Sequence, residues 1–592
     1  MIQPSSFYAE KITQYEIAGM GMKRKISLYA ILRFIGFGSL LLSLYFYFRM
    51  HEPVFLAYGI GFLLVFFWLI RISLDLREKN QLNEKLLFIN HNEAGVAENR
   101  LSRFDNGGAF GQGASYTEDL DIFGEGSLYH LLNRTTTSHG SAQLSALLKD
   151  PFLTTALIRA YQEAIKTLSP QADKRQLLTA HGLLGREENG NLHSLTEWLN
   201  TPGRLDRLVW LRVARIALPV FNLAGLWYFL YSDRLFPLLA GIAASSLLTV
   251  FFMKYINRQH KRVSKKQEIL NQYASIIEVF STVGTGASEK LTQLSQTIRN
   301  AKEAIRALSR LTSFLDQRGN LLVASLFNMF FLYDLQCLFS LEKWKGRFRT
   351  DFPQWIAAIA EIETLNSLST YAFNNPGYAY PFLREGKPGM EAAQMAHPLI
   401  PEKERTPNDF SIGKDNRLQV ITGSNMSGKT TFLRTVGINL LLARCGAPVC
   451  AAHFSITPMA ILTSIRINDS LREHTSYFMA ELNRLAKLVR TLETGKPALA
   501  LVDEILRGTN SEDKTYGSAQ FIRRLLRHNC VALFATHDLS LGTLEKEYPG
   551  VVSNYCFESV IRDNELFFDY KLKSGIAKNR NASFLMNRMD II

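Results

Sequence analysis

The sequence predicts a multidomain protein, in which a mostly helical region contains two transmembrane helical hairpins and a C-terminal α/β domain follows with a parallel sheet. Three observations predict this fold class. Four apolar runs without a charged side chain come in two pairs, helical periodicity dominates the segments around them, and short β-rich runs alternate with helical stretches in the last third of the chain. At roughly 150 residues per domain, the chain can bury several cores, which excludes a minimal binding module.

Composition is that of a globular protein and limits the possible partners. Hydrophobic residues make up 47% and charged residues 20% of the chain, which excludes bulk disorder. Five cysteines without a Cys-x-x-Cys pair predict reduced cytosolic thiols, with neither a disulfide framework nor a zinc site. The 67 Lys and Arg residues against 53 Asp and Glu residues give a net charge of +14, which favours nucleic acid or an anionic membrane face as a partner.

The four apolar runs are candidate membrane spans. Each is close to the ~17–25 residues that a helix needs to cross about 30 Å of hydrocarbon. Buried core helices are the alternative, but the aromatic residues at the ends of the runs favour spanning helices. The runs cover residues 34–48, 54–70, 216–232 and 235–253.

Short polar turns join these runs into two hairpins, which we expect at residues 28–74 and 213–256. Lysine and arginine cluster outside the hairpins and are scarce at their tips, so both hairpins should point out of the cytosol. Residues 1–22 lack the apolar core of a secretory signal. We therefore expect a multi-pass protein of the inner or cytoplasmic membrane, with the lipid bilayer as a partner and both termini in the cytosol. A later apolar run, 321–333, is too short to span and predicts a buried helix.

The polar segments predict the remaining domain organisation. From Leu291 to Leu308, apolar residues recur with the three-four spacing of a single amphipathic helix. Its basic side, which contains Arg299, Lys302, Arg306 and Arg310, is either a solvated face or a phosphate-contacting face. The expected segments are an N-terminal cytosolic segment (1–27), a juxtamembrane helix with a flexible Gly-rich linker (75–118), a helical core and lever in two parts (119–212 and 257–383), and the α/β domain (384–592).

The α/β domain contains a phosphate-binding loop. The pattern G-x-x-x-x-G-K-[ST] lies between an expected strand at 418–422 and a helix that begins near Thr430, and a chance match in an irregular loop is the alternative. Glycines let backbone N–H groups surround phosphates, Lys429 supplies a charge to the β and γ oxygens, and the Thr430 hydroxyl binds Mg²⁺. The pattern thus predicts ATP and Mg²⁺ as cofactors. The predicted nucleotide contacts are Gly423, Ser424, Asn425, Met426, Ser427, Gly428, Lys429, Thr430 and Thr431.

Two further expected strands end in polar residues. The apolar run 498–502 is followed by Asp503, a candidate Mg²⁺ ligand, and Glu504, which could orient or deprotonate the attacking water. The run 531–535 leads to His537, at the carboxyl edge of the same sheet, where it could sense the γ-phosphate. An ordinary strand end and a lone surface histidine are the alternatives. The catalytic candidates are therefore Lys429, Glu504 and His537, and the metal ligands are Thr430 and Asp503.

Four ordered motifs carry a family resemblance. Residues 422–434 read Thr-Gly-Ser-Asn-Met-Ser-Gly-Lys-Thr-Thr-Phe-Leu-Arg, 476–481 read Ser-Tyr-Phe-Met-Ala-Glu, 501–509 read Leu-Val-Asp-Glu-Ile-Leu-Arg-Gly-Thr, and 535–537 read Ala-Thr-His. This set resembles the MutS-type ATPases of DNA mismatch repair. Further similar segments at 128–140, 396–398 and 407–409 extend the resemblance over roughly residues 119–584.

The resemblance implies ATP hydrolysis, DNA as a partner, and a homodimer in which Ser476 completes the nucleotide site of the partner. The chain also departs from the family. No Phe-x-Glu wedge precedes the first hairpin, so we do not expect direct mismatch recognition, and after Phe584 we expect neither C-terminal dimer helices nor a nuclease domain. Ser424, Ser427 and Leu506 stand where the family commonly has Pro, Gly and Gly.

The leading hypothesis is a membrane-anchored MutS-family ATPase that uses ATP to drive rearrangement of its arms and dimer. The alternative is an ATP-gated membrane scaffold or a transporter-like motor with no role on DNA. A motor of the exporter type is disfavoured because no Leu-Ser-Gly-Gly-Gln-like signature precedes Asp503 and the four spans have little polar lining.

Overall fold

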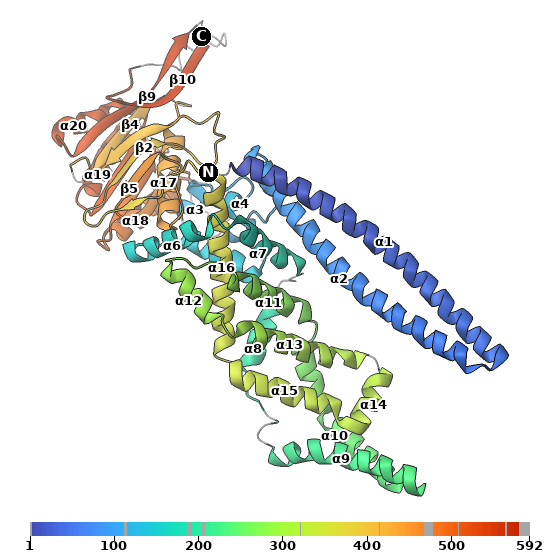
Figure 1. Ribbon diagram of the computed structural model, residues 1–592. Coiled ribbons are helices and arrows are strands. Elements are labelled where there is room, and N and C mark those ends of the chain that lie inside the picture. Colours follow the sequence, from blue (N-terminus) through green and yellow to red (C-terminus); the bar gives the residue numbers. More distant parts are fainter. Residues whose placement is uncertain are drawn as a thin grey trace.

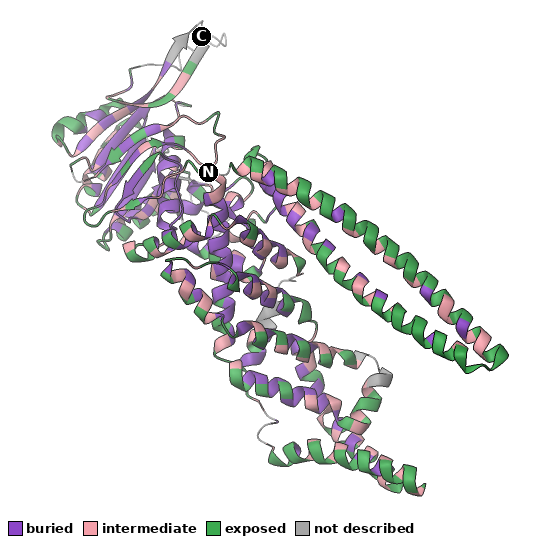
Figure 2. Cartoon of the chain, viewed as in Figure 1, coloured by how far each residue is buried: buried purple, intermediate pink, exposed green. Residues whose placement is uncertain are grey.

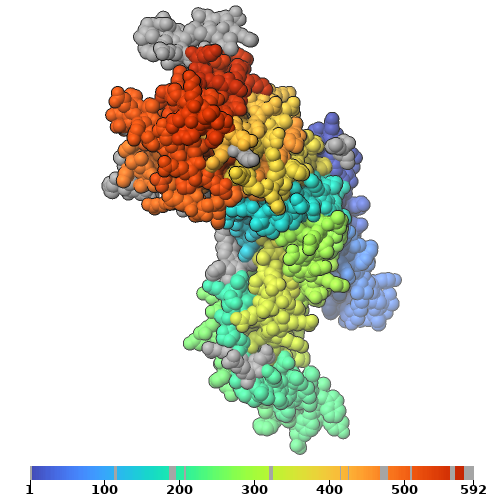
Figure 3. All heavy atoms as spheres, turned by 90° about the vertical axis from the view of Figure 1, so that its left-hand side faces the viewer, coloured from blue at the N-terminus to red at the C-terminus, as the bar shows by residue number. Residues whose placement is uncertain are grey.

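The protein consists of an α/β domain, a helical arm and a long N-terminal hairpin of helices (Figure 1). Figure 3 shows the α/β domain at one end of the arm and the second helical hairpin at the other. The mostly helical fold with a C-terminal α/β domain agrees with the prediction. The computed structural model describes residues 3–111, 115–185, 191–203, 205, 208–319, 321–413, 415–424, 426–466, 477–506, 508, 510–562 and 565–578.

The N-terminal hairpin is formed by α1 (Pro4–Met50) and α2 (Pro53–Ala97). The expected cytosolic segment and juxtamembrane helix are therefore continuous with the apolar runs. At its base the hairpin is fixed to the arm, because the Tyr8 hydroxyl donates a hydrogen bond to Asn374 Oδ1 (2.6 Å). Away from the base its surface is exposed (Figure 2), and only 6% and 11% of the most apolar 18-residue windows of α1 and α2 are buried.

The helical arm is built around α16, which is buried along most of its length and packs against α5, α6 and α7. The second hairpin, α9 and α10, extends from the end of the arm that lies away from the α/β domain (Figure 1). The arm comprises η1 (Gly108–Phe110), α3 (Ser115–Asp119), α4 (Leu128–Leu132), α5 (Ser138–Lys149), α6 (Thr155–Leu168), α7 (Ala172–Leu184), α8 (Asn191–Asn200), α9 (Val209–Ser232), α10 (Phe236–Val263), α11 (Gln267–Ser281), α12 (Glu289–Thr297), α13 (Ala301–Asp316), η3 (Gln317–Gly319), α14 (Leu321–Phe331), α15 (Tyr333–Phe348) and α16 (Asp351–Asn374).

Three predictions about the arm are wrong. The single amphipathic helix is two helices, α12 and α13, because a turn at residues 298–300 interrupts the backbone while the apolar spacing continues across it. The predicted buried helix at 321–333 is α14, which exposes its apolar side chains, because an apolar run alone does not show what will cover it. The described part of the Gly-rich linker is not a loose connection, because the Phe110 ring packs 5.8 Å from the ring of Tyr129.

The α/β domain contains two sheets. The smaller sheet has the order β1-β5-β2-β3 and the larger one β10-β9-β4-β8-β7-β6. In the larger sheet all neighbouring strands run parallel except β9 and β10. Its elements and those of the smaller sheet are β1 (Phe382–Leu383), β2 (Met390–Met395), β3 (Asn408–Ile412), β4 (Leu418–Gly423), α17 (Lys429–Arg444), β5 (His453–Ile456), β6 (Ala460–Ser464), α18 (Tyr477–Leu492), β7 (Ala498–Asp503), α19 (Ser511–Leu525), β8 (Cys530–Thr536), η4 (Leu539–Thr543), α20 (Leu544–Glu547), β9 (Val552–Arg562) and β10 (Glu565–Ser574).

The three strands predicted to lead into the site are confirmed as β4, β7 and β8, and every residue in them is buried. Strand β8 lies between β4 and β7. Because the carboxyl ends of parallel strands meet at one edge of a sheet, the segments that follow these three strands lie side by side. All five cysteines are free and buried, as expected for reduced thiols.

Candidate nucleotide-binding site

The phosphate-binding loop joins β4 to α17, as the pattern predicts. Gly428 has φ 103°, and a Cβ atom there would lie 3.0 Å from the Tyr570 ring, so the position suits only glycine. Met426 has φ 66° and a side chain that is 82% exposed at the rim of the loop. Asn425 lies outside the described residues.

The two residues that begin α17 point their polar groups toward the sheet edge. Lys429 is 5% exposed, and its ammonium donates hydrogen bonds to the carbonyl oxygens of Gly423 (2.8 Å) and Ser424 (2.9 Å). The Thr430 hydroxyl donates a hydrogen bond to Asp503 Oδ2 at 2.5 Å, which joins the loop to the end of β7. The cation and both predicted metal ligands therefore belong to one cluster.

Glu504 and His537 complete this cluster. His537 Nε2 contacts Glu504 Oε1, and His537 Nδ1 lies 2.6 Å from the Gly423 carbonyl oxygen and 3.5 Å from Lys429 Nζ. Glu504 directly follows β7, and its backbone has φ 46°, an uncommon conformation for a residue other than glycine. His537 thus positions a carboxylate beside the phosphate-binding loop.

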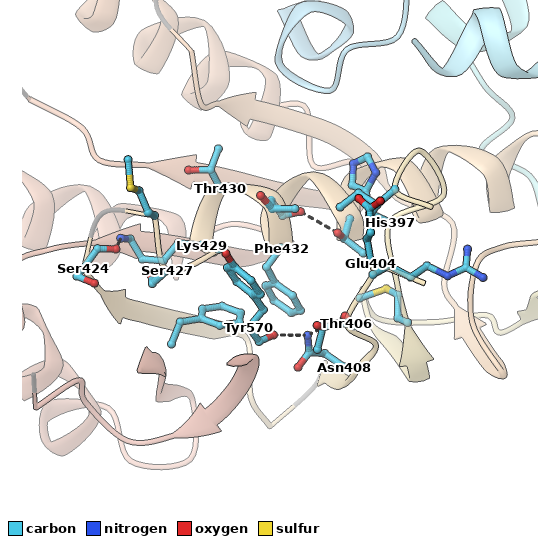
Figure 4. Close-up of a pocket in the computed structure, with 18 of the residues that line it drawn as sticks. His397, Glu404, Thr406, Asn408, Ser424, Ser427, Lys429, Thr430, Phe432 and Tyr570 are labelled. Carbon is cyan, nitrogen blue, oxygen red and sulfur yellow. Dashed lines mark hydrogen bonds between the residues drawn. The ribbon is translucent and has the colours of Figure 1, made fainter. Parts of the chain in front are cut away.

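A cavity of about 490 Å³ opens beside the cluster. Ser424, Ser427, Lys429 and Thr430 lie along one part of the cavity and His397 on another (Figure 4). Further lining residues are Met426, Gly428, Thr431, Glu504 and Tyr570. The volume falls in the range of small-molecule and cofactor sites.

Two side chains shape the rest of this cavity. Burial, and secondarily the nearby Arg434 guanidinium, lower the pKa of His397 to about 4, so its imidazole is neutral at physiological pH. Asn408 holds the backbone around Tyr570, because its amide donates to the Tyr570 carbonyl oxygen (3.0 Å) and its Oδ1 accepts from the Leu572 N–H (2.8 Å). The Tyr570 ring is thereby fixed over Gly428.

Comparison with known proteins identifies the domain. A family model of MutS domain V matches residues 419–586. The DNA mismatch repair protein MutS of Thermotoga petrophila is 33% identical over 223 residues, which are 37% of this chain and 27% of that protein. The C-terminal domain is similar to domain V of the MutS family. The same protein of Chlorobium phaeovibrioides is 33% identical over 231 residues, 38% of this chain and 26% of the relative. That of Chloroflexus aurantiacus is 33% identical over 228 residues, with shares of 37% and 23%.

These alignments cover about a quarter of the length of the curated MutS proteins. The described nucleotide contacts and catalytic candidates predicted from sequence lie together at one edge of the sheet or line its cavity. Ser476, predicted to complete the site of a partner, lies outside the described residues.

Sequence reasoning missed two carboxylates that support this site. Glu481 on α18 is fully buried, and its Oε1 accepts a hydrogen bond from the Leu506 N–H at 2.6 Å. Leu506 has φ 63°, so Glu481 stabilises an unfavourable turn two residues after Glu504. The position of Glu481 in the family motif was a signal for such a role.

The second missed carboxylate is Asp119 in α3, which is fully buried although a domain boundary was expected beside it. It accepts hydrogen bonds from the backbone N–H groups of Ile465 (3.1 Å) and Arg466 (2.9 Å) and pairs with the Arg484 guanidinium. Asp119 therefore ties the start of the arm to the α/β domain. No local pattern marks this role.

Proposed function

We propose that this protein is a membrane-anchored ATPase of the MutS family that binds and hydrolyses ATP with Mg²⁺ to rearrange its arm. The observation that carries the proposal is the cluster at the edge of the sheet. Lys429, the Thr430–Asp503 pair and the Glu504–His537 pair come from three neighbouring strand ends and lie beside one cavity. A cation, oxygen ligands and a general base are the parts that phosphoryl transfer to water requires.

The donor set fits Mg²⁺. The Thr430 hydroxyl and the Asp503 carboxylate, whose oxygens lie 2.5 Å apart, are oxygen ligands of the kind that Mg²⁺ prefers and would hold the ion. A bound Mg²⁺ would supply positive charge to the β and γ phosphate oxygens. Lys429 would bind the same phosphates, and Ser424, Met426, Ser427, Gly428 and Thr431 would surround them with the loop.

Glu504 is the proposed base that orients or deprotonates the attacking water. Its contact with His537 fixes the direction of the carboxylate, and His537 in turn lies 2.6 Å from the carbonyl oxygen of Gly423 in the phosphate-binding loop. A change in loop geometry on nucleotide binding would therefore reach Glu504 through His537. This link supports the proposed sensor role of the histidine.

Membrane anchoring is the second part of the proposal. Four helices, α1, α2, α9 and α10, are long and apolar enough to cross a membrane. The tips of both hairpins point away from the α/β domain (Figure 1). This arrangement supports a multi-pass protein of the inner or cytoplasmic membrane, with both termini and the ATPase domain in the cytosol.

DNA binding is proposed from the names of the relatives, which are DNA mismatch repair proteins, and a homodimer through the ATPase domains is proposed from the resemblance of the sequence motifs to the MutS family. The basic side of α13 gives this part limited support. Lys302 Nζ and Arg306 Nη2 lie 2.8 Å and 2.5 Å from the carboxylate oxygens of Glu278, so much of the charge of this face is already paired. The proposal of contacts to DNA phosphates, without recognition of a mismatch, rests instead on the net charge of +14 and on the names of the relatives.

The enzymatic proposal is tested with purified full-length protein in detergent. Glu504→Gln should keep nucleotide binding and lower turnover by about 10²–10⁴-fold, the usual contribution of a general base. Lys429→Ala should weaken nucleotide binding. The matched control is Glu493→Gln, which neutralises a half-exposed glutamate that pairs with Arg524 far from the cavity. Unchanged turnover in Glu504→Gln would show that Glu504 is not the general base.

The rival reading is an ATP-gated membrane scaffold with no DNA role. It is favoured by the pairing of Lys302 and Arg306 with Glu278. Binding of nucleotide-loaded protein to matched, mismatched and branched DNA separates the two proposals. ATP turnover without binding to any of these DNAs would favour the scaffold.

A further inference from the structure

Helix α14 at the far end of the arm presents apolar side chains on its surface. Leu326 is 58% exposed, Phe327 47% and Phe331 40%. The helix contains no charged residue, so its exposed face is apolar. Helix α15 follows after a 78° bend and differs sharply, because Leu335, Leu338 and Trp344 are buried in the arm. Unlike α15, helix α14 therefore requires an apolar environment that the described part of the chain does not supply.

Contacts along α10 define the path of the chain into α14. Where α13 ends, Asp316 Oδ1 lies 3.2 Å from His260 Nε2, and Asp316 Oδ2 accepts a hydrogen bond from the Lys265 N–H at 2.9 Å. Two residues later, the Arg318 guanidinium donates to Asn257 Oδ1 (3.0 Å). Residues closer to α14 therefore contact positions on α10 that lie farther from its basic C-terminal end.

The last contact lies in the apolar middle of the second hairpin. The side-chain amide of Asn222 donates hydrogen bonds to the carbonyl oxygens of Met329 (3.0 Å) and Phe330 (3.1 Å), and it also lies 3.0 Å from Ser245 Oγ on α10. Asn222 is fully buried on α9, within a helix that otherwise carries exposed apolar side chains. Helix α14 thus runs antiparallel to α10, from the basic C-terminal end of α10 to the level of Ser245.

The distances correspond to about half of a bilayer. From Asn257 to Ser245 the rise along α10 is about 18 Å, and the 11 residues of α14 span about 16 Å. The hydrocarbon core of a bilayer is about 30 Å thick. If α10 crosses the membrane, the end of α14 lies near its midplane.

The hydrogen bonds at the end of α14 are those that this depth requires. The last carbonyl groups of a helix lack partners within the helix, and at membrane depth they must be satisfied by protein. Asn222 satisfies the carbonyl groups of Met329 and Phe330. The bend that follows is at Leu332, which has φ 52° and is fully buried, so the irregular backbone does not face lipid.

We propose that α14 is a re-entrant membrane segment, which enters the acyl-chain region from the cytosolic side beside α10, reaches about mid-depth and returns through Leu332 into α15. The occupant of its exposed face is lipid, because this face continues the apolar surface of the second hairpin. The proposal rests on the proposed membrane anchoring of that hairpin and adds a fifth embedded helix that does not cross.

The test measures depth in full-length protein reconstituted into phosphatidylcholine and phosphatidylglycerol vesicles. Single cysteines replace Leu326 or Phe331 and carry an environment-sensitive fluorophore, and the five native cysteines are buried. Lipids with a nitroxide at a shallow or a deep acyl position quench from within the bilayer, and iodide quenches from water. Leu247→Cys on α10, 73% exposed, is the lipid control, and Arg310→Cys on α13 is the water control.

The proposal expects loss of fluorescence with nitroxide lipids and protection from iodide at both α14 positions, with Phe331 quenched more by the deep nitroxide than Leu326. Quenching of both positions by iodide, with Leu247 still in lipid, would overturn the re-entrant segment and leave the hairpin intact. Protection from both quenchers would overturn it in favour of a second copy of the chain over α14. Iodide quenching at Leu247 would remove the membrane proposal itself.

Discussion

Replacement of Asp119 by asparagine tests how firmly the arm is joined to the α/β domain. Asp119 Oδ1 accepts from the Arg466 N–H, while Oδ2 accepts from the Ile465 N–H and the Arg484 guanidinium. Asparagine has nearly the same shape but carries one acceptor oxygen and no charge. One set of these donors then faces an NH₂ group instead of an acceptor.

The expected loss of stability follows from burial. Asp119 is fully buried and the Arg484 side chain is 16% exposed, so water replaces the lost partners poorly. Removal of one member of a buried ion pair costs about 3–5 kcal/mol, and retention of one acceptor oxygen places this substitution near the lower end, at about 3 kcal/mol. At about 2–4 °C per kcal/mol for 150–250 residues, the thermal midpoint should fall by about 6–12 °C.

Differential scanning fluorimetry in detergent measures this shift. The matched control is Asp173→Asn, which also removes one charge, from an aspartate whose side chain is 62% exposed and lies 2.7 Å from Lys11. Exposed pairs contribute about 0–1 kcal/mol, so the control should move the midpoint by a few degrees at most. Equal shifts in the two variants would refute the conclusion that Asp119 joins the arm to the α/β domain.

Three further predictions concern topology, DNA and pH. Cysteines placed at Glu52 and Asp233 should react with a membrane-impermeant reagent on intact cells, and protection of both would argue for buried soluble helices. DNA affinity should fall steeply with salt and be equal for a duplex with and without one mispair, and a clear preference for the mispair would restore mismatch recognition. Because burial and Arg434 lower the pKa of His397 to about 4, the unfolded chain takes up a proton between about pH 6.5 and 4 that the folded chain does not. The free energy of unfolding therefore decreases as the pH is lowered through that window. From pH 7 to pH 5, His397→Gln should lose up to about 2 kcal/mol less of this free energy than the wild type, which thermal midpoints at the two pH values would show.

The arrangement of the candidate nucleotide site could be predicted from sequence because each part of the site is marked by a short local pattern. The phosphate-binding loop, Asp503 with Glu504, and His537 each follow an apolar strand directly, and a parallel sheet brings such strand ends to one edge. The distances confirm this proximity, with Thr430 Oγ1 2.5 Å from Asp503 and His537 Nδ1 2.6 Å from the loop carbonyl.

The contacts between domains could not be predicted in this way. Asp119 and Arg484 are 365 positions apart, and neither stands in a pattern that indicates a partner. The exposure of the apolar side chains of α14 could not be predicted either, because an apolar run is compatible both with burial in protein and with an apolar surface. The contact of Asn222 with the end of α14, and that of Arg318, just before α14, with Asn257 on α10, show which face of the hairpin the run follows.

Further contacts that the sequence does not reveal join the phosphate-binding loop to the arm. Arg434 lies little more than one turn after the phosphate-binding loop on α17 and pairs with Asp121 at 2.6 Å, two residues after Asp119. Asp121 also pairs with Arg466 at 2.8 Å, so the loop helix and the sheet hold the same segment of the arm. From this joint α16 runs as one buried helix, with the N-terminal hairpin fixed at Asn374 near one end and the second hairpin beyond the other. Under the membrane anchoring proposed above, the two hairpins lie at opposite ends of one continuous helix, so a tilt of the arm as one body would carry them to different depths in the bilayer. The membrane would then resist or report that tilt, a role that a purely passive anchor would not have.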